Sequence, residues 1–322
     1  MSLPCVSVII LNFNGAEHLP ICLESLLAQT YPHLEIIVAD NGSSDDSAAI
    51  CAAFERVNFV PLGRNYGFGL GNNLGARQAR GEYLFFVNND MRFAPDLVEM
   101  LVSTAEPIPN LFALDCKQYN WDGTQAIHTA TRFCSAPLGA SFVPFVDQRQ
   151  VDVAEIVPVP FANGANLFCY KERFDRLGGF DPTFFFSWED VDLCWRAWLL
   201  GWQTLHVPQA VCWHKVGATS NRPIATDRER SAWDEKSFRN PHHNHFRFTM
   251  KTMSMGKNVN VLIWLVVSIA GYLKQGHHTR AKLLTLAYWD CLKEWREIVY
   301  QRREALAGRH TASKTLIARF LT

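Results

Sequence analysis

The chain lacks three features that would each have assigned it to a class. Its 31 Lys and Arg balance 31 Asp and Glu, and zero formal net charge argues against nucleic acid as the main partner. Its nine cysteines include no C-x-x-C pair, which indicates a reducing compartment rather than a disulfide framework. It also has no internal repeat. Hydrophobic residues make up 48% of the chain, enough for a globular core.

Two further scarcities concern the ends of the chain. A strand-like run begins within six residues of Met1, which leaves no room for a signal peptide, so we expect a cytoplasmic protein. Acidic residues are scarce from Lys251 onward, where Lys and Arg occur about three times as often as Asp and Glu. A basic, partly apolar tail on a neutral body predicts peripheral contact with an anionic surface, here the cytoplasmic face of the membrane.

Strands and helices alternate over the first 106 residues. The β-branched run "VSVIILNFN" (6–14) predicts a buried strand, and apolar residues at helical spacing follow over 16–29. The later elements are a strand in 34–40, a helix in 47–55, a strand in 57–63, a short helix in 71–80 and a strand in 82–90. This order predicts an α/β fold, in which a mostly parallel sheet is flanked by helices on both faces.

Polar side chains stand where three of these strands end. They are Asn12 to Asn14, Asp40 to Ser43, and Asn88 to Asp90. Asn and Asp are common in turns, so each group alone indicates no more than a turn. In a parallel sheet, however, ligands bind beyond the carboxyl ends of the strands. The three groups together predict a ligand site at that edge.

The rest of the chain is less regular. Residues 94–105 and 187–202 have helical patterns, and the second helix opens on acidic residues that the helix dipole alone would favour. The apolar run at 259–273 is fifteen residues long, short of the roughly 20 that span a bilayer. It is either a buried core helix or an interfacial helix. Residues 280–306 predict one amphipathic helix with a basic face.

Four ordered segments together resemble the inverting family-two glycosyltransferases, which have the Rossmann-like GT-A fold. The segments are "VSVIILNFNGAEHLPICLESLLAQTYPHLEIIVADNGSSDDS", "RNYGFGLGNNLGARQARGEYLFFVNND", "GGFDPTFFFSWEDVDLCWRAWLLGW" and "VCWHKVGATS". The resemblance implies a GT-A catalytic domain at 1–220, with a nucleotide-sugar-binding half at 1–106 and an acceptor-binding half at 107–220. Residues 221–322 would form a C-terminal helical, membrane-associating extension.

The resemblance implies a divalent cation, Mn²⁺ or Mg²⁺, bound at the end of the 82–90 strand. Such a cation prefers oxygen ligands supplemented by substrate phosphates, and it stabilises a diphosphate leaving group. Asp90 matches the family's DxD motif, but Asn88 stands where the first acidic residue belongs. We therefore expect Asp90 to bind the metal and Asn88 to bind the donor sugar or ribose. Asn89 is a further donor contact or a spacer.

His214 in "CWHKVG" matches the histidine that completes the metal shell in relatives, although a half-buried histidine after a strand is the simpler alternative. Asp40 lies where the family binds the nucleobase, and its carboxylate could accept the imide N–H of uracil or thymine. A turn aspartate is the alternative there, and a surface arginine is the alternative for Arg64. The nucleotide-sugar-binding residues that we expect are Asn12, Asn14, Asp40, Arg64, Asn65, Asn72, Asn88 and Asn89.

Asp190 in "WED" matches the family's general base, which removes the proton of the acceptor hydroxyl. We expect Phe185, Phe186 and Trp188 to desolvate this carboxylate and to raise its pKa. Asp192 should cap the helix or pair with Arg196. The acceptor-binding residues that we expect are Glu189, Trp188 and Asn163.

A histidine cluster at 242–245 lacks partnering cysteines, so we expect a surface or phosphate-contacting patch in a polar loop rather than a zinc site.

The closest branch is rhamnosyltransferase-like. It implies transfer of L-rhamnose from dTDP-L-rhamnose to a saccharide on polyprenyl diphosphate, in cell-surface polysaccharide synthesis. Two alternatives stay open. One is transfer from a UDP-sugar (galactofuranose, GlcNAc or glucose), and the other is a nucleotide-sugar-binding relative without catalysis, which Asn88 motivates. A nucleotidyltransferase is disfavoured because no G-x-G-T-R-like motif follows the first strand.

Overall fold

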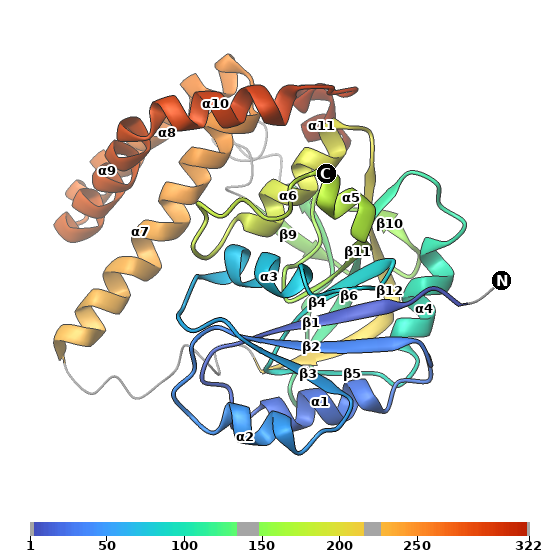
Figure 1. Cartoon of the computed structure of the whole chain (residues 1–322). Coiled ribbons are helices and arrows are strands. Elements are labelled where there is room, and N and C mark those ends of the chain that lie inside the picture. Colours follow the sequence, from blue (N-terminus) through green and yellow to red (C-terminus); the bar gives the residue numbers. More distant parts are fainter. Residues whose placement is uncertain (1–2, 134–147, 216–226, 321–322) are drawn as a thin grey trace.

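The computed structural model describes residues 3–133, 148–215 and 227–320, and its centre is a single large sheet (Figure 1). The strands run in the order β10-β12-β6-β11-β4-β1-β2-β3, with β5 paired to β12 and β7 paired to β6. Their bounds are β1 Val6–Asn12, β2 Leu34–Asp40, β3 Val57–Pro61, β4 Tyr83–Asn88, β5 Met91–Phe93, β6 Leu111–Asn120, β7 Ala126–His128, β10 Val157–Pro158, β11 Asn166–Tyr170 and β12 Gln203–His214. A separate pair joins β8 (Ala130–Phe133) to β9 (Gln148–Val151).

The half of the sheet that contains β3, β2, β1 and β4 is parallel, as predicted. Beyond β4 the sheet is mixed, because β11 runs antiparallel to both β4 and β6. Strand β1 has β2 on one side and β4 on the other, so the chain reverses its direction of winding there. Ligands bind at such a switch point, where Asn12 pairs with Asp40 and Leu11 pairs with Asn88.

Helices cover both faces of the sheet, which confirms the predicted fold class (Figure 1). Val8 and Ile10 face a core shared with α1 and α4, whereas Ile9 faces the core shared with α3 and α6. This alternation is the period of two that a strand imposes. The bounds are α1 Leu19–Leu27, α2 Ser47–Ala52, α3 Phe68–Ala76, α4 Leu97–Ala105, α5 Lys171–Arg176, α6 Glu189–Leu199, α7 Asp227–Thr252, α8 Met255–Lys274, α9 His278–Lys293, α10 Trp295–Leu306 and α11 Ser313–Phe320.

The C-terminal helices differ from expectation in two places. The segment that contains the histidine cluster is not a polar loop but lies within α7. The amphipathic stretch 280–306 is two helices, α9 and α10, which are separated at Glu294. Helices α7 to α10 share a hydrophobic core of their own. The domain boundary that we expected at residue 220 lies outside the described residues.

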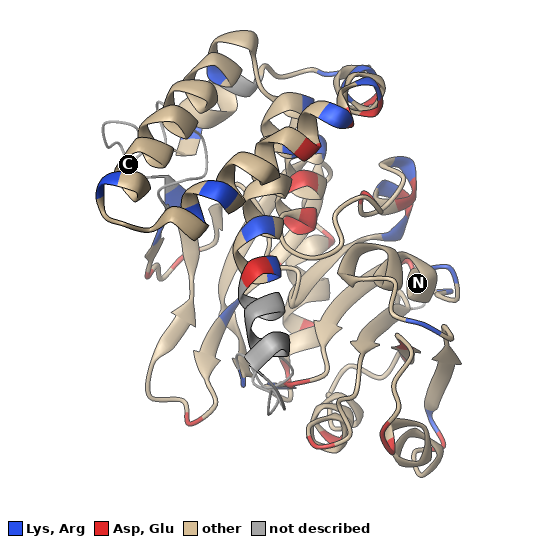
Figure 2. Cartoon of the chain, turned by 90° about the vertical axis from the view of Figure 1, so that its left-hand side faces the viewer, with Lys and Arg blue, Asp and Glu red and all other residues tan. Residues whose placement is uncertain are grey.

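Helix α8 is long and apolar enough to cross a membrane by length and composition, and 11% of its most apolar window is buried. Val261 and Leu265 are its buried residues. Its exposed large hydrophobic residues are Met255, Val259, Leu262, Ile263, Val266, Val267 and Leu273. Figure 2 shows Lys and Arg spread along the C-terminal helices. Helix α8 is therefore mostly surface and not the core helix that was one of our two expectations.

Buried ion pairs attach α7 to α6 and to the segment that precedes α6. The ammonium of Lys251 lies 2.8 Å from Asp181 and 2.7 Å from Asp192. Asp192 also binds Arg196 at 2.8 Å, which confirms the pairing expected for it. Burial alone would raise the pKa of Asp181, but the charge and hydrogen bond of Lys251 lower it to about 2. Removing either partner of such a buried pair leaves an uncompensated charge, so these contacts hold α7 in place.

Candidate active site

Asn12 connects the polar ends of β1, β2 and β4. Its amide nitrogen donates to the Asp40 carboxylate at 2.9 Å and to the Ser43 hydroxyl at 3.2 Å. Its amide oxygen accepts a 2.7 Å hydrogen bond from Asn89. Asn12, Asp40 and Asn89 are all buried. Asn89 is therefore not a spacer in the structure, because it is tied through Asn12 to the strand end where we expect the nucleobase.

Asn14 and Asn41 shape the two loops beside this network. The backbone amide of Asn14 donates to the Ser43 hydroxyl at 2.7 Å, and its side chain accepts from the Ser44 amide at 2.7 Å. Asn41 accepts from the Tyr66 amide at 2.8 Å and donates to Asn65 at 3.1 Å. The segment around Asn65 is thus held against the end of β2. Sequence reasoning missed Asn41, although "ADNG" places it directly after Asp40.

The two other expected donor residues lie on or before α3. Arg64 is exposed, and its guanidinium stacks over the Tyr66 ring at 4.6 Å. Asn72 is buried and donates to the Phe68 carbonyl at 3.1 Å, while its side-chain oxygen has no hydrogen-bond partner among the described residues. Gly67 has a φ of +78°, and a side chain there would collide with Phe185. This glycine brings the donor-side loop against the loop that precedes α6.

Asp90 and His214, which we expected to bind a metal ion, lie side by side in the structure. Asp90 Oδ1 lies 3.2 Å from His214 Nε2. This Asp90 oxygen is buried and accepts no hydrogen bond from a described residue. Gln118 contacts the other ring nitrogen of His214 at 3.2 Å. Two neighbouring ligands of an octahedral Mg²⁺ or Mn²⁺ are about 3 Å apart, so the spacing and the unsatisfied oxygen both fit a divalent cation.

The loop of residues 163–165 connects the end of β4 to the start of α6. The Gly164 amide donates to Asp190 Oδ2 at 2.9 Å. The Ala165 carbonyl accepts a 3.2 Å hydrogen bond from the Asn88 amide at the end of β4. The backbone amide of Asn163 donates to Asp115 at 3.0 Å. Three consecutive residues therefore contact the end of β4, strand β6 and the start of α6.

Asp190, which we expected to be the general base, has a raised pKa. Burial raises its pKa, against hydrogen bonds from the amides of Gly164 and Val191 that lower it. Burial and then the charge of Asp190 raise the pKa of Glu189 well above its ordinary value. Both carboxyl groups therefore resist ionisation more strongly than they would in water. Phe185 and Phe186, which we expected to desolvate Asp190, are 52% and 42% exposed.

Helix α7 supports the segment before Asp190. Ser187 and Trp188 both have positive φ, 73° and 77°, a conformation that costs about 1–2 kcal/mol for each L-residue. Asn244 on α7 donates to the carbonyls of Phe186 and Ser187 at 2.9 and 2.8 Å. Backbone strain of this kind is concentrated at active sites.

The same helix corrects our expectation for the histidine cluster. His245 is buried and stacks on the Trp188 ring at 4.6 Å, so it is not part of a surface patch. His242 is stacked on Phe238, and burial lowers its pKa. Two of the three histidines thus pack on aromatic rings, and nothing in the sequence indicated that they share a helix with Asn244.

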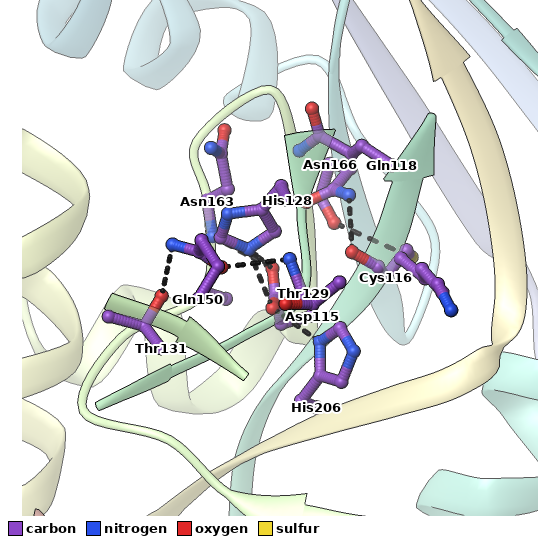
Figure 3. Close-up of polar contacts among 12 residues, drawn as sticks. Asp115, Cys116, Gln118, His128, Thr129, Thr131, Gln150, Asn163, Asn166 and His206 are labelled. Carbon is purple, nitrogen blue, oxygen red and sulfur yellow. Dashed lines mark hydrogen bonds and ion pairs between the residues drawn. The ribbon is translucent and has the colours of Figure 1, made fainter. Parts of the chain in front are cut away.

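A second polar cluster is buried among strands β6, β7 and β12 (Figure 3). Asp115 on β6, His128 on β7 and His206 on β12 are buried, and their potential ligand atoms lie within 4.8 Å of one another. Sequence reasoning missed all three, because they come from strands far apart in the chain. "ALDCKQYN" does place a charged residue in an apolar strand, which was the available signal.

Comparison with known proteins shows which family the chain belongs to. The model of the family described as "Glycosyl transferase family 2" matches residues 7–175, more than half of the chain. The chain belongs to glycosyl transferase family 2. A second model, "Glycosyltransferase (GlcNAc)", matches residues 103–262 of this family 2 chain.

Two named relatives are similar to this chain over most of its length. An N-acetylglucosaminyl-diphospho-decaprenol L-rhamnosyltransferase of Mycobacterium tuberculosis is 28% identical over 249 residues, 69% of this chain and 79% of the relative. The low-salt glycan biosynthesis hexosyltransferase Agl10 of Haloferax volcanii is 22% identical over 82% of this chain and 81% of its own length.

Solved structures extend the likeness in fold. The mannosyltransferase PcManGT of Pyrobaculum calidifontis, in complex with GDP-Man and Mn²⁺, superposes with a TM-score of 0.57 at 18% identity, over 96% of this chain and 86% of that one. GalNAc-T7 with UDP, GalNAc and Mn²⁺ gives a TM-score of 0.60 at 17% identity, over 80% of this chain and 49% of that one. At 17–18% identity, these similarities show a shared fold and nothing further.

A substitution at Gly15 tests how tightly the hydrogen-bonded Asn12 and Asn89 side chains are packed in this family 2 chain. A Cβ at Gly15 would fall 1.9 Å from the Asn89 amide nitrogen and 2.4 Å from the Asn12 amide oxygen. We expect Gly15→Ala to lower the free energy of unfolding by about 1–3 kcal/mol, as overpacking does, in urea titrations. Gly256→Ala is the control, because α8 leaves its Cβ position open. Equal stabilities of the two variants would contradict the prediction.

Proposed function

We propose that this chain is an inverting, metal-dependent hexosyltransferase that transfers a sugar from a pyrimidine nucleotide sugar to a saccharide acceptor. The specific donor proposed is dTDP-L-rhamnose, and the acceptor is a saccharide on polyprenyl diphosphate. The reaction serves cell-surface polysaccharide synthesis. The observation that carries the proposal is the 163–165 loop, which joins the Asn88 strand end to the Asp190 carboxylate.

The choice of sugar and acceptor rests on the mycobacterial relative. Its name specifies L-rhamnosyl transfer to N-acetylglucosaminyl-diphospho-decaprenol, and the similarity covers 79% of its length. Asp40 supports a pyrimidine base, since a buried carboxylate at the end of β2 can accept an imide N–H. The competing donor class is a UDP-sugar, which the UDP-bound structures of the same fold favour.

The transfer is a single displacement at the anomeric carbon. The acceptor hydroxyl oxygen attacks that carbon while its proton passes to the Asp190 carboxylate. The bond between the anomeric carbon and the diphosphate oxygen breaks, and the diphosphate leaves with the electron pair. Glu189 orients the acceptor, and Trp188 and Asn163 are the other proposed acceptor contacts. The raised pKa of Asp190 makes it a stronger base.

Asp90 and His214 are the residues that would hold Mn²⁺ or Mg²⁺. Bound there, the cation would neutralise charge on the diphosphate. Asn88, Asn89 and Asn12 supply amide groups for the sugar or ribose. An Asn at position 88 leaves one carboxylate in the motif, and His214 provides the second protein ligand.

Peripheral binding at the cytoplasmic leaflet is the proposed location. Helix α8 exposes an apolar face, and Lys257 and Lys274 flank it. Trp289 and Trp295 are 55% and 51% exposed on the adjacent helices, and such side chains are enriched at membrane interfaces. The occupant of this face is an anionic lipid surface that carries the polyprenyl acceptor.

Asp190→Asn tests the general base. Because an amide cannot take the acceptor proton, we expect kcat for transfer to fall by about 10²–10⁴-fold, with nucleotide-sugar affinity nearly unchanged. Product formation and donor binding by calorimetry measure the two effects. Asp96→Asn, at an exposed helix terminus, is the control. Retained turnover in Asp190→Asn would exclude Asp190 as the base.

A thermal-shift panel tests the donor and the metal. With Mn²⁺ we expect dTDP-L-rhamnose to raise the Tm more than UDP- or GDP-sugars, since a ligand at 100 times its Kd adds about 2.7 kcal/mol. EDTA or His214→Ala should remove most of the shift, while the exposed His33→Ala should not. A larger shift with a UDP-sugar would reassign the donor, and an EDTA-insensitive shift would contradict the metal site.

Flotation with liposomes tests the location. Full-length protein should float with anionic vesicles and less with neutral ones, because the basic tail adds electrostatic attraction. Val266→Ser combined with Val267→Ser should weaken binding. Ile21→Ser with Ile156→Ser, two comparably apolar exposed positions outside α8, is the control. A folded wild-type protein that stays with the soluble fraction would contradict membrane binding.

A further inference from the structure

The cluster formed by Asp115, His128 and His206 has no role in the site described so far. Asp115 is fully buried and lies at the centre of the cluster (Figure 3). Its carboxylate contacts His128 Nε2 at 2.8 and 3.0 Å and His206 Nδ1 at 2.7 Å. A buried charge of this kind is seldom retained for stability alone, since apolar residues of similar volume are often as stable.

The distances describe a hydrogen-bonded network and not a metal centre. Two ligands of a tetrahedral zinc ion with bonds of about 2.0 Å are about 3.3 Å apart, longer than the 2.7 and 2.8 Å found here. Both oxygens of Asp115 already accept hydrogen bonds, one of them also from the Asn163 amide. Because Asp115 is acceptor-only when ionised, the ring nitrogens that face it carry protons.

The Asn163–Gly164 backbone connects this network to the proposed base. The amide of Asn163 donates to Asp115 at 3.0 Å, and the next amide, that of Gly164, donates to Asp190 Oδ2 at 2.9 Å. Two consecutive amides thus bind two carboxylates, one in the buried network and one at the acceptor side. We propose that Asp115 and His128 are positioning residues for sugar transfer: Asp115 holds the loop that orients Asp190, and His128 holds Asp115 in place through its ring nitrogen.

The electrostatics agree with this arrangement. Burial alone would raise the pKa of Asp115, but His128 and His206 lower it to about 2. Burial alone would lower the pKa of His128, but Asp115, with a smaller contribution from Asp190, raises it above its ordinary value. The titratable groups that interact with Asp190 are Glu189 on the same helix, His128 on β7 and Cys194 one turn along α6. His128 is the basic group among them.

The inference rests on Asp190 as the proposed base, and a pH–rate profile tests it. His128→Gln keeps an amide donor for Asp115 but removes the imidazole, whose charge when protonated lowers the pKa of Asp190. Because a nearby cation lowers a carboxylate pKa, its removal should raise that of Asp190. The acidic limb of kcat/KM should then move to higher pH, by up to about one unit, with an unchanged KM for the donor. A merely structural role would lower the rate equally at every pH.

Asp115→Asn tests whether Asp115 holds the loop of residues 163–165 in place. We expect a loss in kcat of about tenfold to a hundredfold, as small misplacements of catalytic groups produce, with little change in donor affinity. Asp152→Asn, an exposed carboxylate whose side chain is 70% exposed, is the control. If Asp115→Asn does not fold, the pH profile of His128→Gln decides, since that variant keeps the carboxylate.

The outcomes separate this inference from the proposed function. If Asp190→Asn is inactive but His128→Gln leaves the acidic limb in place, Asp190 remains the base and the positioning role is wrong. If Asp190→Asn retains a pH-dependent turnover, the proposed base is wrong whatever His128→Gln does. Metal analysis adds a third arm: stoichiometric zinc that is lost in His206→Ala would overturn the hydrogen-bonded network.

Discussion

The backbone of residues 163–165 is the constraint on which the site depends. Three successive peptide groups contact Asp115 on β6, Asp190 on α6 and Asn88 at the end of β4. Backbone groups have no rotamers, so this loop sets the relative positions of the donor and acceptor sides more rigidly than side chains could. A glycine suits its centre, because a Cβ at Gly164 would already lie 3.1 Å from the Phe68 ring.

The C-terminal helices also contact the segment around Asp190. Asn244 holds two carbonyls of a strained turn, and Lys251 pairs with Asp192, two residues beyond Asp190. The same helices expose the apolar face of α8. The surface proposed to bind lipid and the segment before Asp190 are therefore connected through α7.

Much of the fold could be predicted, because its signals are local. The β-branched run that forms β1 and the alternation up to β4 predict a parallel sheet, and strand ends in such a sheet share an edge, so Asn12, Asp40 and Asp90 could be grouped in advance. Asp115 and Asn244 could not, since their importance depends on contacts to residues 48 and 58 positions away. Helix α7 was mistaken for a loop because Pro241 and many polar residues obscure its period; tertiary contacts with Trp188 and Asp181 stabilise it instead.

Our central proposal is that a metal ion and the donor diphosphate bind together at the end of β4. The most direct measurement is a crystal structure with dTDP and Mn²⁺, in which anomalous scattering at the manganese edge locates the ion. We expect a peak in contact with Asp90 Oδ1 and His214 Nε2, with the diphosphate on the same ion. A peak at Asp115 and His206, or bound dTDP with no ion beside Asp90, would contradict it.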